Sequence, residues 1–273
     1  MICIPSLRFC LFLLLLPLLM GAPAYAADII RVGGTGMGLA LMRIVGTQVE
    51  REHPAIQTQV LPSLGTTGGL KALAAGAIEV AIATRKATPE ENAAGIRTAA
   101  CMTTALIFAT SRSQNFNLTR EELPALYSAS DPRWPDGQPL KVILRSRTGS
   151  ENPYLVKAIP ALEPAFAAAF RRSGIPVGAT DQENAEFAQK TAGSLAITTL
   201  LQVRTEKLNL TPLALDGVVP SPQSIADGSY SLPLPVCLLV RENATPATRL
   251  VASYITTPAG QAVTRANGAE PSP

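Results

Sequence analysis

The sequence repeats one order of elements: a short apolar strand, a turn of small polar residues, and then an amphipathic helix. A strand is predicted over residues 28–32, and the glycine-rich turn of residues 33–36 follows it directly. Apolar residues then recur at helical spacing over residues 39–49, as they do in a helix with one buried face. A second strand at residues 56–61 leads into the turn of residues 65–69 and another helix. Further strands are predicted at residues 78–83, 102–110, 141–144, 194–198 and 236–240. One long apolar-rich helix is predicted over residues 155–170, and a frayed carboxy terminus over residues 268–273. This alternation of strands and helices predicts an α/β fold.

The composition supports a folded protein and argues against a nucleic-acid ligand. The chain has 273 residues, enough for one large domain or two small ones, and 47% of them are apolar. The formal net charge is only +3, and no run of four basic residues occurs. A protein that neutralises the phosphates of a nucleic acid needs clustered Lys and Arg, so we expect no nucleic-acid partner.

A single histidine removes several catalytic chemistries. His53 is the only imidazole of the chain, and it lies in a charged stretch before Pro54 that is typical of a solvated helix end. Histidine-rich zinc sites and the serine and cysteine hydrolases need a well-placed imidazole. A hydrolase that uses Ser146 or Ser150 as its nucleophile is therefore disfavoured. We expect no catalytic residue, no metal and no cofactor.

The amino terminus has the pattern of a cleavable export signal. Arg8 precedes an apolar run over residues 11–20, which is too short to span a bilayer. A small-x-small sequence, Ala-Tyr-Ala, ends at Ala26 and predicts cleavage there. Residues 1–26 would then be the signal peptide, and the mature periplasmic protein would begin at Ala27.

Glycines and small hydroxyl residues follow several of the predicted strands, and helices are predicted after these turns. Free backbone N–H groups and the positive end of the dipole make a helix start favourable to an anion, and hydroxyl and guanidinium groups add donors. A Ser or Thr before a helix usually serves only as a cap, so a single turn is weak evidence. Four such turns at the carboxyl ends of strands, two of them with an arginine, together indicate an anion site. The candidate ligand-binding residues are Thr35, Gly36, Thr66, Thr67, Thr84, Arg85, Arg145, Thr148, Gly149 and Ser150.

Several of these segments resemble the phosphate-binding proteins of phosphate ABC transporters. Three features are similar to the first lobe of that family: Thr35 after the first strand, Gly-Thr-Thr-Gly-Gly-Leu-Lys at residues 65–71, and Glu-Val-Ala-Ile-Ala-Thr-Arg at residues 79–85. Residues 134–145, the Thr-Gly-Ser turn at residues 148–150, and residues 187–196 are similar to the second lobe. The similarity keeps its order over nearly the whole mature chain, which makes it more specific than any one motif.

The resemblance implies a two-lobed, type II periplasmic binding protein fold, with a mixed sheet flanked by helices in each lobe. Residues 27–111 and 235–273 would form lobe 1, and residues 112–234 would form lobe 2. The resemblance also implies an exported solute-binding protein, and not an enzyme, that captures a small phosphate-like oxyanion between its lobes for ABC-type uptake. The implied partners are that anion and an inner-membrane ABC permease, and we expect a monomer. The alternative is a periplasmic sensor or assembly module of the same fold without a transport role.

The sequence departs from this family where the ligand would bind. The family's anion loop reads Gly-Ser-Gly-Thr, whereas residues 147–151 are Arg-Thr-Gly-Ser-Glu. Thr84 stands where the best-known phosphate binders have an Asp that accepts the phosphate's own proton, which weakens the case for phosphate over a fully ionised anion such as sulfate. We expect Glu151 to point outward on the first helical turn, where it is favourable to the helix dipole.

The two arginines of the turns have different expected roles. Arg145 ends a predicted second-lobe strand beside the turn of residues 148–150, so we expect it to be the main charged partner of the anion. Two roles stay open for Arg85. It faces the ligand, or it pairs with an acidic residue across the cleft.

The mature chain would hold two cysteines, Cys101 and Cys237, both in apolar, strand-like runs. In the resembling fold these strands are antiparallel neighbours, and the exported state permits a disulfide. Two buried free thiols fit the sequence equally well, because the strand register decides whether the two sulfur atoms meet.

Overall fold

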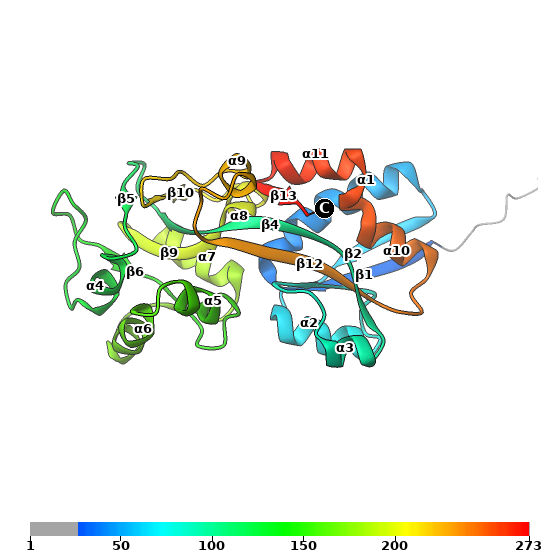
Figure 1. Ribbon diagram of the computed structural model, residues 1–273, viewed down its shortest axis with the longest axis horizontal. Helices are drawn as coiled ribbons and strands as arrows, with labels where there is room; N and C mark the ends of the chain where they lie inside the picture. The colour runs from blue at the N-terminus through cyan, green and yellow to red at the C-terminus, as the bar shows by residue number, and fades with distance from the viewer. Residues whose placement is uncertain (1–26, 273) are drawn as a thin grey trace, which may run out of the picture.

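A computed structural model describes residues 27–272, so the signal peptide predicted over residues 1–26 lies outside the described residues. The main sheet is mixed and nine-stranded. In spatial order its main path is β2 (Ile56–Val60), β1 (Asp28–Gly34), β3 (Val80–Ala83), β12 (Pro233–Arg241), β4 (Ile96–Thr110), β9 (Ser194–Thr199) and β6 (Lys141–Val142). Two short strands, β10 (Thr211–Pro212) and β13 (Ala269–Pro271), also pair with β4. The long antiparallel strands β4 and β12 run through the middle of the molecule and connect its two ends (Figure 1).

At one end, helices cover both faces of the parallel strands β1, β2 and β3. Strand β3 shows why, because its alternate side chains enter different cores. Val80 and Ile82 pack in one cluster of buried residues with the helix that follows β1. Ala81 packs in another cluster with Leu70 and Leu73 of the helix that follows β2. The helices at this end are α1 (Leu39–Glu52), α10 (Pro246–Ser253) and α11 (Pro258–Ala266) on one side and α2 (Gly65–Ala74) and α3 (Pro89–Ala93) on the other (Figure 1).

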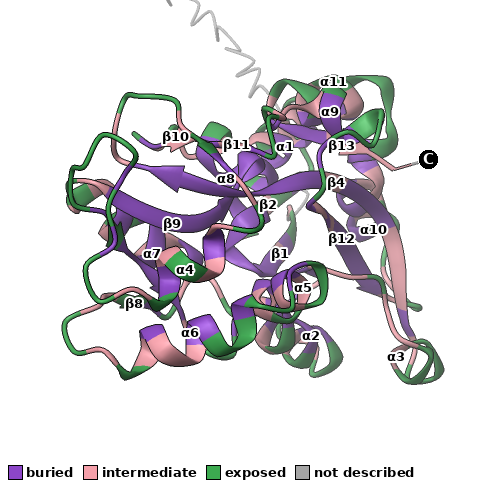
Figure 2. Cartoon of the chain, turned by 60° about the vertical axis from the view of Figure 1, so that its left-hand side comes forward, coloured by how far each residue is buried: buried purple, intermediate pink, exposed green. Residues whose placement is uncertain are grey.

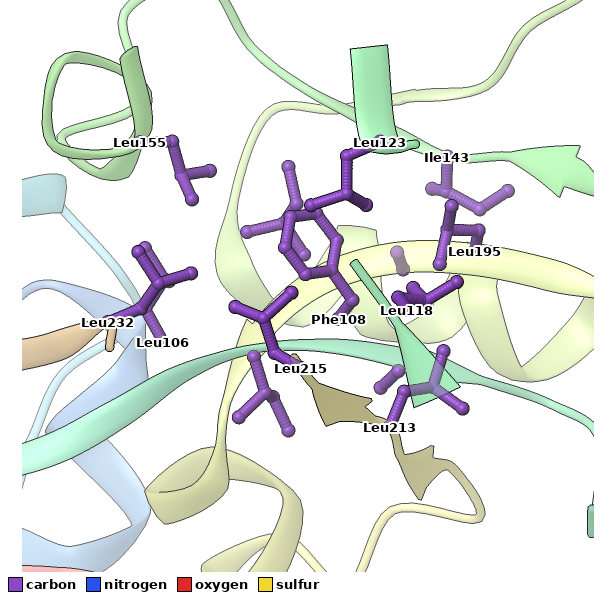
Figure 3. Packing of buried hydrophobic residues seen from close by; sticks show 14 of the residues in the cluster. Leu106, Phe108, Leu118, Leu123, Ile143, Leu155, Leu195, Leu213, Leu215 and Leu232 are labelled. Atoms are coloured by element: carbon purple, nitrogen blue, oxygen red, sulfur yellow. The ribbon is translucent and has the colours of Figure 1, made fainter. Parts of the chain in front are cut away.

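The other end has its own core around β4 and β9. Phe108 of β4 lies among leucines from several elements, including Leu118, Leu123 and Leu215 (Figure 3). The strands at the centre are buried, while the outer surfaces of the surrounding helices are exposed (Figure 2). The helices here are α4 (Leu123–Ser128), α5 (Glu151–Ala158), α6 (Leu162–Arg171), α7 (Asp181–Lys190), α8 (Leu200–Thr205) and α9 (Pro222–Ala226). Two small parallel sheets complete this end: β5 (Asn117–Leu118) with β11 (Ala214–Leu215), and β7 (Leu144–Arg145) with β8 (Val177–Gly178).

The two cysteines form a disulfide. Cys101 of β4 and Cys237 of β12 are direct partners in the antiparallel register, and their Cα atoms are 4.1 Å apart. Both residues are buried, in the same cluster as Leu70 and Leu73 of α2. The disulfide therefore cross-links the two central strands, and the alternative of two free thiols is wrong.

Two boundaries differ from the sequence prediction. The single helix expected over residues 155–170 is two helices, α5 and α6, because Pro160 has no N–H to continue the first one. The carboxy terminus, which looked frayed, instead forms β13 on β4. Ala269 is fully buried there, and the Thr104 hydroxyl donates a hydrogen bond to the carbonyl of Gly268 at 2.8 Å.

Candidate functional site

Turns from both ends of the sheet meet around a polar cavity of about 410 Å³, which we call the inner cavity. Its walls come from Thr35 after β1, from residues 63–68 before and within the start of α2, from the turn after β7, and from residues 179–181. The helices α2, α5 and α7 begin at this cavity or directly beside it. The first N–H groups of a helix have no partner within the helix, so these starts direct donors and positive dipole ends toward one space.

Glycines allow the turn after β1 and the start of α2 to approach each other closely. Gly34 has a φ of 127°, which favours glycine, and a Cβ atom there would lie 2.1 Å from the carbonyl oxygen of Ile82. A Cβ atom on Gly69 would lie 2.6 Å from the Cα of Gly34. The glycine-rich turns of the sequence therefore allow the start of α2 to pack on the end of β1.

Seven of the ten residues predicted to bind ligand line the inner cavity. They are Thr35, Thr66, Thr67, Arg145, Thr148, Gly149 and Ser150. The three that do not line it are Gly36, Thr84 and Arg85. The structure thus brings together the hydroxyl residues of both halves of the predicted site.

Arg145 is buried and already engaged by two carboxylates. Its Nε donates to Glu151 Oε1 at 2.6 Å, its Nη2 lies 3.0 Å from Asp181 Oδ1, and its Nη1 donates to the carbonyl of Gly178 at 3.3 Å. The β7–β8 pairing produces this geometry, because it places Arg145 opposite Gly178, just before the turn into α7. We call Arg145, Glu151 and Asp181 the Arg145 triad.

The expectation that Glu151 points outward is wrong. Only 1% of its surface is exposed, since the carboxylate turns inward to pair with the buried guanidinium of Arg145. Burial raises the pKa of this carboxyl group above its ordinary value, Arg145 opposes that rise, and the nearby Asp181 adds to it. With all three groups ionised, one guanidinium and two carboxylates leave the triad with one negative charge.

Asp181 also links the two ends of the molecule. Its Oδ2 accepts a hydrogen bond from the Thr35 hydroxyl at 3.3 Å, and Gln182 donates to the carbonyl of Gly36 at 3.1 Å. A Cβ atom on Gly36 would lie 2.4 Å from the side-chain oxygen of Gln182, so Gly36 serves this contact and does not face the cavity. Asp181 was not among the predicted site residues, although it follows Ala179 and Thr180 in one more small-residue turn between a strand and a helix.

Thr84 and Arg85 lie on a second, more open cavity of about 460 Å³, which we call the outer cavity. Thr84 lies behind Thr66, whose hydroxyl accepts from the Thr84 N–H at 3.2 Å. Arg85 makes two hydrogen bonds to Glu91, at 2.7 and 2.8 Å, and Glu91 belongs to the capping box of α3 on the same side of the molecule. Arg85 does pair with an acidic residue, but not across the cleft.

The outer cavity adjoins the inner cavity and shares five lining residues with it. Both are lined by Thr66, Thr67 and residues 148–150, and the outer cavity adds Arg147 together with Lys157 of α5. Helices α2 and α5 lie side by side at this place (Figure 2). Arg147 and Lys157 were not among the predicted site residues.

Over residues 27–272, no group of three or more His, Cys, Asp or Glu side chains is arranged to hold a metal ion. In the same part of the chain, no helix has the length and apolar character needed to cross a bilayer.

The chain thus has an α/β fold, with a mixed sheet covered by helices and a polar cavity among strand-to-helix turns. The chain matches a family described as the PBP superfamily domain over residues 21–259, and it belongs to this family. No curated protein matches the sequence significantly.

Solved structures share the fold at low sequence identity. A substrate-binding protein assigned to a phosphate ABC transporter of Clostridium perfringens, solved with bound phosphate, is 14% identical with a TM-score of 0.74, over 90% of this chain and 100% of that chain. The periplasmic molybdate-binding protein of Azotobacter vinelandii is 12% identical with a TM-score of 0.57, over 88% and 98%. PEB3 with bound L-phospholactate is 10% identical with a TM-score of 0.54, over 88% and 99%. The predicted two-lobed, type II periplasmic binding protein fold is confirmed, and the three ligands differ from one another.

Proposed function

We propose that the protein is an exported solute-binding protein, and not an enzyme, that captures a small phosphate-like oxyanion between its two lobes for ABC-type uptake. Lobe 1 comprises residues 27–111 and 235–273, and lobe 2 comprises residues 112–234. The mature chain begins at Ala27 in the periplasm, and an inner-membrane permease receives the ligand from a monomeric binding protein. Amino-terminal sequencing of the periplasmic protein tests the cleavage site, which is wrong if residues 1–26 are retained.

The observation that carries this proposal is the meeting of helix starts and hydroxyl groups at the inner cavity. Thr66 and Thr67 lie in the first turn of α2, and residues 148–150 directly precede α5. Backbone N–H groups and hydroxyls in this arrangement donate hydrogen bonds to an oxyanion, and the helix dipoles favour its charge. The phosphate-bound structure from Clostridium perfringens supports a ligand of this kind.

The charge of the Arg145 triad restricts which oxyanion binds. With both carboxylates ionised the triad carries one net negative charge and repels an anion unless a proton is shared between them. Inorganic phosphate keeps at least one proton near neutral pH and can donate it to Asp181, which lines the inner cavity. Sulfate and molybdate have no proton to donate. Asp181 therefore takes the role that the family's Asp would have at the position of Thr84.

Titration calorimetry of the mature protein against phosphate, sulfate and molybdate at pH 7 tests the proposal. We expect phosphate to bind more tightly than the other two anions. A preference for sulfate or molybdate would refute the role of the triad, and the absence of binding by all small anions would refute the oxyanion site.

The alternative, a periplasmic sensor or assembly module of the same fold, is favoured by one observation. Arg145, the buried cation of the cavity, already has two carboxylate partners within the protein. If no small anion raises the melting temperature of the mature protein, this alternative accounts for the cavity better than uptake does.

A further inference from the structure

The combined volume of the inner and outer cavities exceeds the volume of an inorganic anion. Pockets of about 300–1,000 Å³ enclose whole organic ligands, whereas a water molecule takes about 30 Å³ of liquid volume, and a tetrahedral oxyanion is only a few times larger than water. The inner cavity alone has about 410 Å³, and the outer cavity adds about 460 Å³ of more open space. An oxyanion at the shared hydroxyl turns would leave the outer cavity to another part of the ligand.

The outer cavity carries positive charge that the protein does not neutralise. Arg147 and Lys157 form no ion pair with any residue from 27 to 272, in contrast to Arg85, which pairs with Glu91. Lys157 lies on the same face of α5 as Pro153 and Tyr154, which also line this cavity.

Arg147 is held in position without losing its hydrogen-bonding capacity. Its guanidinium carbon lies 4.0 Å from the ring centroid of Phe170, so the face of the guanidinium is packed. The N–H groups of a guanidinium point outward in its plane, and stacking leaves them able to bind an oxyanion or a carboxylate. Tyr154 is also fixed, because its hydroxyl donates to the carbonyl of Pro233.

The two cavities therefore differ in how their cations are paired: Arg145 of the inner cavity is bound by two carboxylates, whereas Arg147 and Lys157 of the outer cavity have no acidic partner among residues 27–272. We propose that the natural ligand has two negative groups: an oxyanion bound at the hydroxyl turns, and a second anionic group bound by Arg147 and Lys157. The ligand class is a phosphoryl compound that also carries a carboxylate or a second phosphoryl group. This inference rests on the proposed oxyanion function, which it makes more specific.

Calorimetry with four probes tests the inference: inorganic phosphate, methyl phosphate, 3-phosphoglycerate and pyrophosphate. Methyl phosphate is the control for a substituent without charge. We expect one of the two doubly anionic probes to bind at least about tenfold more tightly than methyl phosphate, as hydrogen bonds to charged groups allow. Comparison of 3-phosphoglycerate with pyrophosphate shows whether the second group is a carboxylate or a phosphoryl group.

The double variant Arg147→Ala/Lys157→Ala should lose this advantage, and its affinity for the doubly anionic probe should fall by more than its affinity for inorganic phosphate. Lys71→Ala, an exposed cation of α2 outside both cavities, is the matched control and should change nothing. Equal affinities for methyl phosphate and both doubly anionic probes would overturn the inference while phosphate binding still supports the proposed function. An equal loss of phosphate and of the doubly anionic probe in the double variant would also overturn it. If none of the four probes binds, the proposed function and this inference both fail.

Discussion

Replacing Asp181 by Asn tests whether the Arg145 triad selects an oxyanion by accepting its proton. Asp181 is 3% exposed, and its two oxygens face the Arg145 guanidinium at 3.0 Å and the Thr35 hydroxyl at 3.3 Å. The substitution keeps the shape of the side chain, removes one negative charge, and replaces one carboxylate oxygen with an amide group that donates hydrogen bonds.

The ratio of the affinities for phosphate and sulfate isolates the effect of the proton. Near neutral pH, HPO₄²⁻ and SO₄²⁻ have the same charge and nearly the same size, so removal of the Asp181 charge helps both anions about equally. Only phosphate loses a charged acceptor for its proton, and such a hydrogen bond is worth about 1.5–3 kcal/mol. An Asn carbonyl retains part of this interaction. We therefore expect the phosphate-to-sulfate ratio to fall by roughly tenfold or more.

Calorimetric titration of both anions into natural protein and Asp181→Asn at pH 7.5 gives the ratio. Glu186→Gln is the matched control, because Glu186 is an exposed carboxylate of the same helix, α7, and pairs with the exposed Lys190. A melting curve for each variant shows that the fold is retained. An unchanged ratio in Asp181→Asn, with both affinities measurable, would show that Asp181 does not accept the ligand's proton.

Three further substitutions have expected outcomes. Thr66→Ala removes a neutral hydroxyl from the inner cavity and should weaken phosphate binding by about 1 kcal/mol, or roughly fivefold, in calorimetry; an unchanged affinity would exclude Thr66 from the contact. Removal of the disulfide by Cys101→Ser/Cys237→Ser should lower the free energy of unfolding by about 2–5 kcal/mol in urea titrations, and a variant as stable as the natural protein would contradict this. Because the pKa of Glu151 is raised in the folded protein, the stability associated with this carboxyl is present at low pH and is lost as the pH rises through the raised pKa. Glu151→Gln should therefore gain melting temperature relative to natural protein between pH 5 and pH 8, and parallel pH profiles would refute the assignment.

The sequence contains the local part of this structure. The order of strands and helices from β1 to β3 follows from apolar spacing, and the glycines at the turns mark the close approach of Gly69 to Gly34. The break between α5 and α6 was not predicted, but it is local too, because Pro160 cannot extend a helix. These features depend on residues close together in the chain.

The other features that were not predicted depend on contacts between distant residues. The β7–β8 pairing joins Arg145 to Gly178 across two intervening helices, and this pairing brings Asp181 to the guanidinium. The orientation of Glu151 was ambiguous for the same reason. A carboxylate in the first turn of a helix favours the dipole whether it points in or out, and only the buried Arg145 decides between the two. The disulfide likewise requires a register in which Cys101 and Cys237 face each other, and a shift of one residue would have turned one of them to the opposite face.

The role of Arg145 itself calls for a charge-balanced test. Arg145→Ala alone leaves two buried carboxylates without their cation, and removing one partner of a buried ion pair commonly costs about 3–5 kcal/mol of stability. A loss of ligand binding in that variant would therefore not show that Arg145 contacts the anion.

The double variant Arg145→Ala/Glu151→Gln removes one positive and one negative charge, so the remaining carboxylate of Asp181 gives the same net charge as the natural triad. If Arg145 donates hydrogen bonds to the anion, phosphate binding in the double variant stays at least about tenfold weaker than in natural protein. If Arg145 only balances its two carboxylates, the double variant recovers most of the affinity that the single variant loses. The buried arginine, which the sequence singles out as the anion's main partner, would then be a positioning residue for Glu151 and Asp181. The direct contacts to the ligand would come from the hydroxyl turns and helix starts.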